Sequence, residues 1–258
     1  MPEGDTILHA VRQMGPVLAG AVPEEVLTPQ PRHARDRWSE RLEGRAVRAV
    51  DAHGKHLFVR FEGGLTIHSH LRMTGAWGVY ARGARWRRSP RRAWLVLRTS
   101  GHEVVQFDGP VLELMTDSRT RFDQRLAGLG PDVLADELDA GRFLRRLRQD
   151  DPTRGIGEAL LDQRNLAGIG NVWKAEGCWE AGIDPWRPVA RITNDEGLAV
   201  VGAARRGMLA SAAGRGFPER VRVYDRAGRE CPRCGGRVAA RGQGDDCRTT
   251  FWCPGCQR

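Results

Sequence analysis

The sequence has almost no lysine and no long hydrophobic run. Of its 41 cationic residues only Lys55 and Lys174 are lysines, so arginine supplies nearly all of the positive charge. No apolar run approaches the roughly 18 residues that a membrane-spanning helix needs. The first twenty residues include Glu3, Asp5 and Arg12, and they lack the unbroken apolar segment of a signal peptide. We therefore expect a cytoplasmic protein without a membrane span.

The charge balance is strongly positive, with a formal net charge of +9 and an isoelectric point of about 10.0. A polyanionic partner such as nucleic acid fits this balance. GC-rich coding is the alternative explanation for the many arginines. Where arginine is the common cation, a lysine points to a position that favours a titratable amine. The 258 residues, 40% of them hydrophobic, are enough to form real cores.

Four of the six cysteines form two C-x-x-C pairs, "CPRC" and "CPGC", with 18 residues between them. This spacing is typical of a structural zinc site, in which two turns close a tetrahedron of thiolates. The expected zinc ligands are Cys231, Cys234, Cys253 and Cys256. Cys247 lies between the pairs and is the alternative ligand, whereas Cys178 is interpreted as an ordinary buried thiol.

Hydrophobic periodicity predicts a helix over residues 5–20, with Asp5 or Thr6 as its N-cap and Gly20 as its stop. Residues 22–115 contain short runs separated by turn signals, which predict an antiparallel β-sandwich. The basic run "YARGARWRRSPRR" is interpreted as a solvated loop, with a phosphate-facing edge as the alternative.

A helical region follows. The stretch "IGEALLDQRNLAGIGNVWKAEGCWEAGI" predicts a helix through Leu160 and Leu161, a glycine turn, and a second helix that begins near Asn171. Exposed amides at the start of that second helix would suit a phosphate. Taken alone, a helix, a glycine turn and a helix often serve only packing. From residue 221 the pattern predicts short strands folded around the metal.

Proline follows the initiator methionine, and this position has two interpretations. If Met1 is removed, Pro2 becomes a secondary amine with an ordinary pKa near 8. Such an amine can attack an electrophilic carbon and form an iminium. The alternative is an inert residue at a frayed terminus.

Four separated motifs resemble the formamidopyrimidine-DNA glycosylase and endonuclease VIII family: the N-terminal "PEG", "HGKHLF", "DQRNLAGIGN" and "RTTFWCPGCQ". The resemblance covers the whole chain in order. It implies an α+β multidomain fold: an N-terminal antiparallel β-sandwich with a leading helix (1–118), a helix–two-turns–helix domain (119–220) and a C-terminal β-ribbon zinc finger (221–258). It also implies a bifunctional DNA glycosylase/AP lyase of base excision repair that acts as a monomer on damaged DNA.

The resemblance implies a role for each catalytic candidate. Pro2 would attack C1′ of the damaged nucleotide, and Glu3 would protonate the sugar ring oxygen as the base leaves. Lys55 would hold a phosphate next to the lesion and supply a proton, although a lone lysine in a turn is more often a solvated charge. The resulting iminium would lead to β- and then δ-elimination.

The resemblance also implies the DNA contacts. Asn171 and Arg248 would bind phosphates, and Arg248 would donate a proton in δ-elimination. The zinc would be structural and would aim Arg248. Met73 would fill the gap left by the everted nucleotide, with Arg72 beside it. For a methionine in such a place, core filling is the alternative.

Two departures from the family pattern bear on specificity. Thr6 stands where many relatives have a glutamate. In the loop "QFDGPVLELMT", Val111 and Leu112 replace the arginine pair with which the purine-directed branch reads the orphaned cytosine. Neither can donate a hydrogen bond, so we expect oxidised pyrimidines to be preferred. A formamidopyrimidine/8-oxoguanine-specific enzyme is the alternative, with Arg72 or an arginine of residues 82–92 as the reader.

A second class of function is a catalytically inactive, zinc-containing DNA-binding protein on the same scaffold. Such a protein is expected to have lost Pro2, Glu3 or Lys55, and all three are present. A general zinc-ribbon factor would leave residues 1–220 unexplained.

Overall fold

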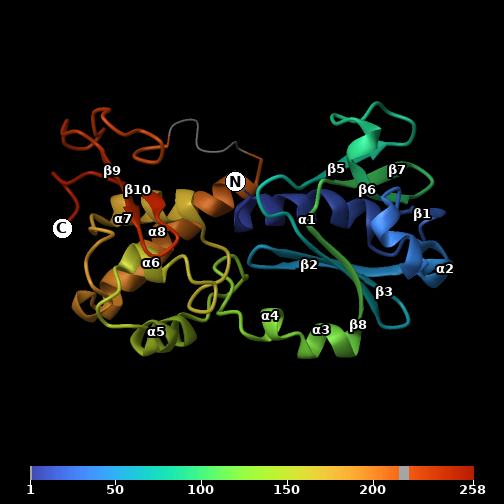
Figure 1. Ribbon diagram of the computed structural model, residues 1–258, viewed down its shortest axis with the longest axis horizontal. Helices are drawn as coiled ribbons and strands as arrows, with labels where there is room; N and C mark the ends of the chain where they lie inside the picture. Colours follow the sequence, from blue (N-terminus) through green and yellow to red (C-terminus); the bar gives the residue numbers. More distant parts are fainter. Residues whose placement is uncertain (1, 215–220) are drawn as a thin grey trace. The chain divides into compact units, whose positions relative to one another are not determined.

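The computed structural model describes residues 2–214 and 221–258, which form two compact units (Figure 1). The first unit comprises residue 2 and residues 6–127, and the second comprises residues 3–5 and 128–258. Met1, whose removal the Pro2 chemistry requires, lies outside the described residues. The predicted boundary at residue 220 also falls there, so the division into three domains stays a prediction.

The first unit contains two four-stranded antiparallel sheets, with strand orders β1-β6-β7-β5 and β2-β3-β4-β8. The strands are β1 (Glu25–Leu27), β2 (Val47–His53), β3 (His56–Phe61), β4 (Leu65–His70), β5 (Ala76–Ala81), β6 (Ala93–Arg98), β7 (His102–Phe107) and β8 (Val111–Thr116). Short helices join or follow them: η1 (Pro31–Asp36), α2 (Trp38–Leu42), η2 (Pro90–Arg92), α3 (Asp117–Phe122) and α4 (Gln124–Ala127). The predicted antiparallel β-architecture is confirmed.

The leading helix α1 (Gly4–Leu18) packs on the core of the first unit. Ile7, Met14 and Leu18 recur at helical spacing and are fully buried together with strand residues. The helix begins at Gly4, so the predicted N-cap at Asp5 or Thr6 is wrong, because both residues lie inside the first turn. Gly20 has φ +80° just after the helix end, which supports the predicted stop.

The hairpins predicted from alternation and glycine turns are confirmed. β2, β3 and β4 pair in succession, and β6 pairs with β7. One expectation is wrong: Val111 and Leu112 do not lie in a loop. They begin β8, where they pair with His70 and Ser69 of β4, so only residues 108–110 separate β7 from β8.

The second unit consists of helices and a C-terminal β-hairpin. Its elements are α5 (Ala140–Gln149), α6 (Ile156–Ala159), α7 (Asn171–Ala181), η3 (Val189–Arg191), α8 (Asn194–Ala212), β9 (Ala239–Gln243) and β10 (Arg248–Trp252). The helix before the glycine turn ends at Ala159, so the expectation that it runs through Leu160 and Leu161 is wrong.

Helices α7 and α8 lie side by side, and the β9–β10 hairpin lies against α7 (Figure 1). The two helices approach closely at Gly177, where a Cβ atom would come within 3.0 Å of the Val200 carbonyl oxygen. Among the residues that the structure describes, none of the helices has both the length and the apolar character needed to cross a membrane.

Candidate active site and metal cluster

The carboxylate of Glu3 is buried at the N-terminus of α7. Its Oε2 accepts hydrogen bonds from the backbone N–H of Gly170 (2.8 Å) and Trp173 (3.3 Å), and its Oε1 accepts one from Val172 (2.8 Å). The side chain is only 1% exposed. Three peptide donors and the positive end of the helix dipole favour a negative charge at this position.

This arrangement corrects one expectation. The sequence predicted that the amides at the start of α7 form a phosphate site, but those of Gly170, Val172 and Trp173 are occupied by Glu3. Glycine is required at position 170 by the close approach, because a Cβ atom there would lie 2.3 Å from Cδ of Glu3.

The turn before α7 is held by Gln163, a residue to which the sequence analysis gave no role. Its Oε1 accepts from Gly168 N (3.0 Å), and its Nε2 donates to the carbonyls of Leu161 (2.9 Å) and Ile169 (3.0 Å). The Gly168 carbonyl in turn accepts from Gly4 N (3.0 Å). Gln163 belongs to the "DQRNLAGIGN" motif, so its position close to the glycines of that motif was the sequence signal that could have predicted its contact with the turn.

The acidic residue nearest to Thr6 is Asp5. Its carboxylate is buried and accepts a hydrogen bond from Ser211 Oγ of α8 at 2.6 Å, while Thr6 is exposed. The chain therefore has a buried acid one position before Thr6.

Asn171 and Lys174 connect α7 to the C-terminal hairpin. Asn171 Nδ2 donates to the Thr249 carbonyl (2.8 Å), and Lys174 Nζ donates to Thr250 Oγ1 (2.6 Å). Thr250 Oγ1 donates onward to Gln243 Oε1 of β9 (2.8 Å). Lys174 is fully buried, and burial lowers its pKa to about 8. Lys174, one of the two lysines of the sequence, therefore links α7 to the β9–β10 hairpin inside the second unit.

A second buried carboxylate anchors the segment that leads to the cysteines. Glu176 of α7 accepts from the backbone N–H of Arg222 (2.8 Å), Val223 (3.0 Å) and Tyr224 (2.9 Å). One turn further along α7, the indole of Trp179 donates to Cys231 Sγ (3.3 Å). Helix α7 therefore supports the cysteine region as well as Glu3.

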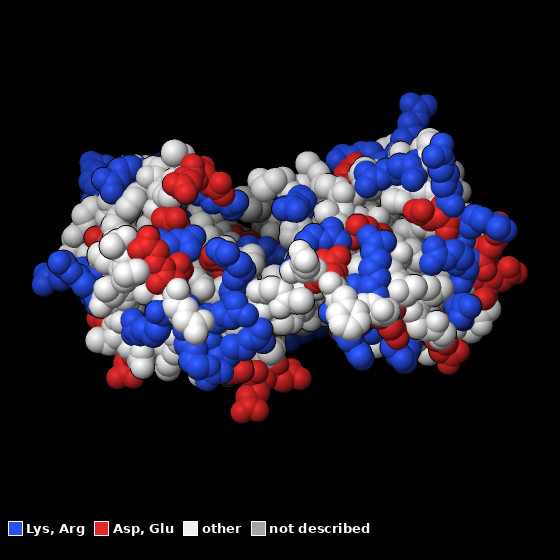
Figure 2. Space-filling view, turned by 60° about the horizontal axis from the view of Figure 1, so that its bottom comes forward, with Lys and Arg blue, Asp and Glu red and all other residues white. Residues whose placement is uncertain are grey.

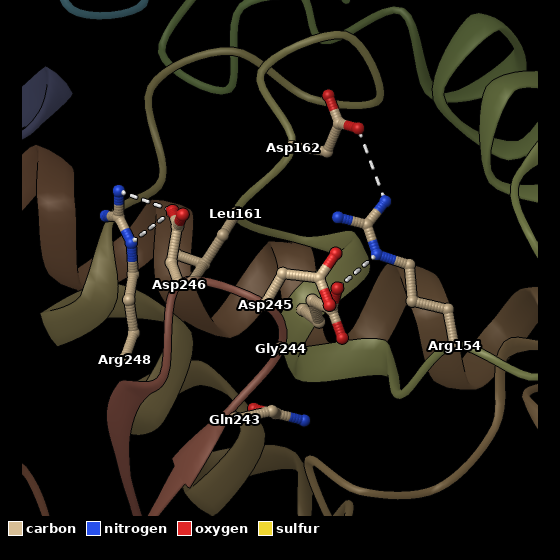
Figure 3. A pocket seen from close by; sticks show the side chains of 9 residues that line it. Arg154, Leu161, Asp162, Gln243, Gly244, Asp245, Asp246 and Arg248 are labelled. Atoms are coloured by element: carbon tan, nitrogen blue, oxygen red, sulfur yellow. Dashed lines mark hydrogen bonds and ion pairs between the residues drawn. The ribbon is translucent and has the colours of Figure 1, made fainter.

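Arg248 begins β10 at the edge of a pocket of about 270 Å³ (Figure 3). Its Nε and Nη2 lie 3.3 Å from Oδ2 of Asp246, while across the pocket Arg154 pairs with Glu158 and Asp162. The Arg248 side chain is 44% exposed and that of Asp246 is 76% exposed. Exposed pairs of this kind are weak, so the guanidinium can exchange Asp246 for another anion.

Four cysteines meet in one cluster. The sulfur atoms of Cys231, Cys234, Cys253 and Cys256 all lie within 4.8 Å of one another. Four thiolates at this spacing can hold a metal ion in a closed tetrahedron. Cys247 is exposed and outside the cluster, and Cys178 is a fully buried thiol whose pKa burial raises to about 12.

In the first unit, Lys55 lies half-buried in the turn between β2 and β3, beside a group of histidines that the sequence analysis missed. His56 Nδ1 and His68 Nε2 share a hydrogen bond of 2.8 Å, and His56 pairs across the sheet with His70. Burial lowers the pKa of His56 to about 2. Burial, together with Arg72 and Lys55, lowers that of His70 to about 4. His56 and His70 are therefore neutral at pH 7.

Arg72 and Met73 lie in the loop between β4 and β5 and are both exposed. Met73 is 63% exposed, which excludes its alternative role as core filler.

The predicted site residues are divided between the two units. Pro2 is half-buried and, like Lys55, belongs to the first unit. Glu3, Asn171, Arg248 and the four clustered cysteines belong to the second. The structure thus groups the predicted site residues by unit, and their joint assignment as one site stays a prediction.

Arginines are interspersed with carboxylates on the face of both units that Figure 2 shows. In the basic segment 82–92, Arg88 and Arg92 both pair with Asp108, and Arg82 pairs with Glu24. The segment is therefore tied down by ion pairs as well as solvated.

Two family models match the chain in succession. The formamidopyrimidine-DNA glycosylase N-terminal domain matches residues 1–122, and the formamidopyrimidine-DNA glycosylase H2TH domain matches residues 129–216. Together they cover well over half of the sequence.

Curated relatives match over the full length of the chain. "Probable endonuclease 8 2" of Streptomyces coelicolor is 44% identical over 270 residues, which cover 100% of this chain and 94% of the relative. "DNA-(apurinic or apyrimidinic site) lyase Nei2" of Mycolicibacterium smegmatis is 36% identical over 265 residues, covering 100% and 99%.

A crystal structure of Lactococcus lactis Fpg (MutM), solved in complex with DNA that contains N7-benzyl-Fapy-dG, has a TM-score of 0.83 to this chain. The two are 21% identical, and the match covers 100% of both chains. This likeness confirms the predicted fold class.

The cysteine cluster predicts one metal ion per chain. Cys253→Ser should abolish stoichiometric metal binding because it opens the tetrahedron, whereas Cys247→Ser should keep it. Elemental analysis of the purified variants measures this. Loss of metal in the Cys247 variant would reassign the ligands.

The contact of Glu3 with α7 predicts that Gly170→Ala is destabilising, because the added Cβ displaces the carboxylate from its three donors. We expect the free energy of unfolding to fall by about 2 kcal/mol or more in urea denaturation. Gly202→Ala is the matched control. It lies inside α8, where an added Cβ would make only an ordinary contact, 3.6 Å from Arg206 Nη1, so it should be neutral or stabilising. Equal stability of the two variants would contradict the anchoring of Glu3.

Proposed function

The chain belongs to the formamidopyrimidine-DNA glycosylase and endonuclease VIII family, and we propose that it removes oxidised pyrimidines from damaged DNA and then cleaves the strand by β,δ-elimination. Its class, a DNA glycosylase/AP lyase of base excision repair, follows from this membership and from the full-length relatives. The observation that supports the proposed mechanism is the buried carboxylate of Glu3, the residue directly after Pro2, which is bound by the backbone amides at the start of α7.

Glu3 would serve Pro2 as a proton acceptor and donor. Three N–H donors hold its carboxylate in place. Only a neutral amine can attack, so the first step would be transfer of the Pro2 ammonium proton to Glu3. Because Pro2 directly precedes Glu3 in the chain, the anchored carboxylate restrains the reacting nitrogen to within a few bonds of a fixed point.

The covalent steps would then follow in order. The Pro2 nitrogen attacks C1′ as the bond from C1′ to the base breaks, and the remaining N–H proton of Pro2 leaves with the base. The proton held by Glu3 passes to the ring oxygen as the bond between C1′ and that oxygen breaks and the iminium forms. Loss of a proton from C2′ expels the 3′ phosphate, and a second elimination expels the 5′ phosphate. Lys55, beside histidines that are neutral at pH 7, would place a positive charge next to a phosphate.

Zinc is the metal that fits the cysteine cluster best, because four thiolates in two C-x-x-C turns are a structural zinc set. All four coordination positions would be filled by protein, so its role would be structural. It would fix the hairpin that carries Arg248, while Asn171 and Lys174 join the same hairpin to α7. We propose that the protein acts on DNA as a monomer.

The preference for pyrimidines rests on the start of β8. By the family resemblance, Val111 and Leu112 correspond to the cytosine-reading arginines of the purine-directed branch. Leu112 is buried in the sheet with 3% exposure. Neither side chain can donate to the pairing edge of cytosine. Two of the alternative readers in the basic segment, Arg88 and Arg92, are held by Asp108. An enzyme without an arginine that recognises the opposite cytosine is suited to lesions whose opposite base is a purine.

The lesion class is tested by single-turnover excision from duplexes that differ only in the damaged base. We expect faster release of thymine glycol opposite adenine than of 8-oxoguanine opposite cytosine. The reverse order would overturn the pyrimidine assignment and favour the 8-oxoguanine-specific alternative. Absence of both activities, with DNA binding retained, would instead support the inactive DNA-binding protein.

Phosphate binding by Arg248 predicts a change in salt dependence. Arg248→Ala should flatten the slope of log affinity against log salt concentration by about one unit, equally for damaged and undamaged DNA. Asp246→Asn is the matched control, because it removes the ion pair and keeps the guanidinium, so it should bind as tightly as the parent or more tightly. An unchanged slope in the Arg248 variant would rule out the phosphate contact.

A further inference from the structure

One arginine ties the loop that carries Met73 to a second loop of the first unit. Arg88 Nη1 donates to the backbone carbonyl of Thr74 (2.9 Å) and to Oδ2 of Asp108 (2.8 Å). Thr74 Oγ1 adds a hydrogen bond to the Asp108 carbonyl (3.3 Å). Residues 71–75, between β4 and β5, are thereby joined to residues 108–110, between β7 and β8.

Asp108 is itself held by a second arginine. Arg92 Nε donates to Oδ1 (3.1 Å), Arg92 Nη2 lies 2.6 Å from Oδ2, and the Asp108 N–H donates to the Arg92 carbonyl (3.1 Å). Burial raises the pKa of Asp108, but the hydrogen bonds from Arg92 and Arg88 outweigh this and hold the pKa below its usual value. Asp108 is therefore a charged, fixed anchor for Arg88 at neutral pH.

The loop itself is tight at its base and exposed at its tip. The Gly75 N–H donates to the Leu71 carbonyl (2.9 Å), and a Cβ atom at Gly75 would lie 2.8 Å from that carbonyl oxygen. Arg72 has φ +48°, and Met73 projects with 63% exposure. The contact of Arg88 with Thr74 lies between this exposed tip and the closed base.

We propose that Arg88 is a positioning residue for nucleotide eversion, which holds residues 72–74 so that Met73 can fill the gap in the duplex. This inference rests on the proposed function and on the wedge role that the family resemblance implies for Met73. Separating stacked bases costs a few kcal/mol. Met73 can therefore replace the everted nucleotide only if the loop of residues 72–74 keeps its conformation when Met73 enters the duplex. Nη1 of Arg88, which donates both to a fixed carboxylate and to a main-chain carbonyl, supplies that stiffness.

The mechanical part of the proposal is tested without DNA. We expect Arg88→Ala to accelerate hydrogen exchange of the backbone amides in residues 72–75, because their link to Asp108 is lost. Arg91→Ala is the matched control: it removes a cation from the same segment, and within residues 2–214 and 221–258 its side chain makes no hydrogen bond or ion pair. Unchanged exchange in the Arg88 variant, with the fold intact, overturns the proposal.

The functional part compares a substrate that needs eversion with one that does not. Arg88→Ala should slow single-turnover excision of thymine glycol from a duplex by roughly tenfold or more. It should cleave an abasic site in a single-stranded oligonucleotide within about twofold of the parent rate, because no wedge is needed there. Arg88→Met, which keeps an unbranched side chain but removes both donated hydrogen bonds, should be impaired on the duplex alone.

A double-mutant cycle shows whether Arg88 acts through Met73. The variant with both Arg88→Ala and Met73→Ala should be no slower on the duplex than Met73→Ala alone. Equal loss on both substrates, or fully additive effects of the two substitutions, would overturn the proposal and indicate a direct DNA contact by Arg88. Parent-like excision by Met73→Ala would refute the wedge role that the resemblance implies for Met73 and with it the proposed action of Arg88, whereas the exchange result tests the link between the two loops by itself.

Discussion

The carboxylate of Glu3, bound by three backbone amides at the start of α7, is the interaction on which the rest of the site depends. It fixes Glu3, the residue that follows the proposed nucleophile Pro2, to the start of α7. Gly170, which provides one of the three amides, is 167 residues away from Glu3 in the sequence. A mobile terminus would carry a large ordering cost into every turnover, and this contact removes most of that cost. The glycine turn, with Gln163 behind it, keeps those amides in place for Glu3.

Helix α7 connects this carboxylate to the metal cluster. From its first turn, Asn171 and Lys174 bond to β10, and further along Glu176 and Trp179 bond to the segment that leads to the cysteines. Arg248 thus stands on a hairpin that is supported from two sides, by α7 and by the four cysteines. In this second unit the buried polar groups are used mainly to position neighbouring segments, and the exposed Arg248 is left available for an anion.

Sequence patterns predicted those parts of the fold that depend on local signals. Alternating residues and glycine turns predicted β2 to β4, "GIGN" predicted the start of α7, and the C-x-x-C spacing predicted the four-cysteine cluster. The partners of Glu3 were not predictable, because backbone amides leave no side-chain signature. Val111 and Leu112 were placed in a loop because motif alignment does not reveal pairing with β4. Lys174 was conspicuous by its rarity, but its partner Thr250 depends on tertiary packing.

The central claim is that the Pro2 amine, placed by Glu3, is the nucleophile. The most direct measurement is borohydride reduction of the processed protein on abasic-site DNA, followed by mass-spectrometric mapping of the adduct. Few other amines can compete with Pro2 for the adduct, because Lys55 and Lys174 are the only lysines of the sequence and Lys174 is fully buried. The account predicts an adduct on the N-terminal nitrogen of Pro2 and none on protein that retains Met1. An adduct on Lys55, formed equally well whether or not Met1 is present, would contradict it.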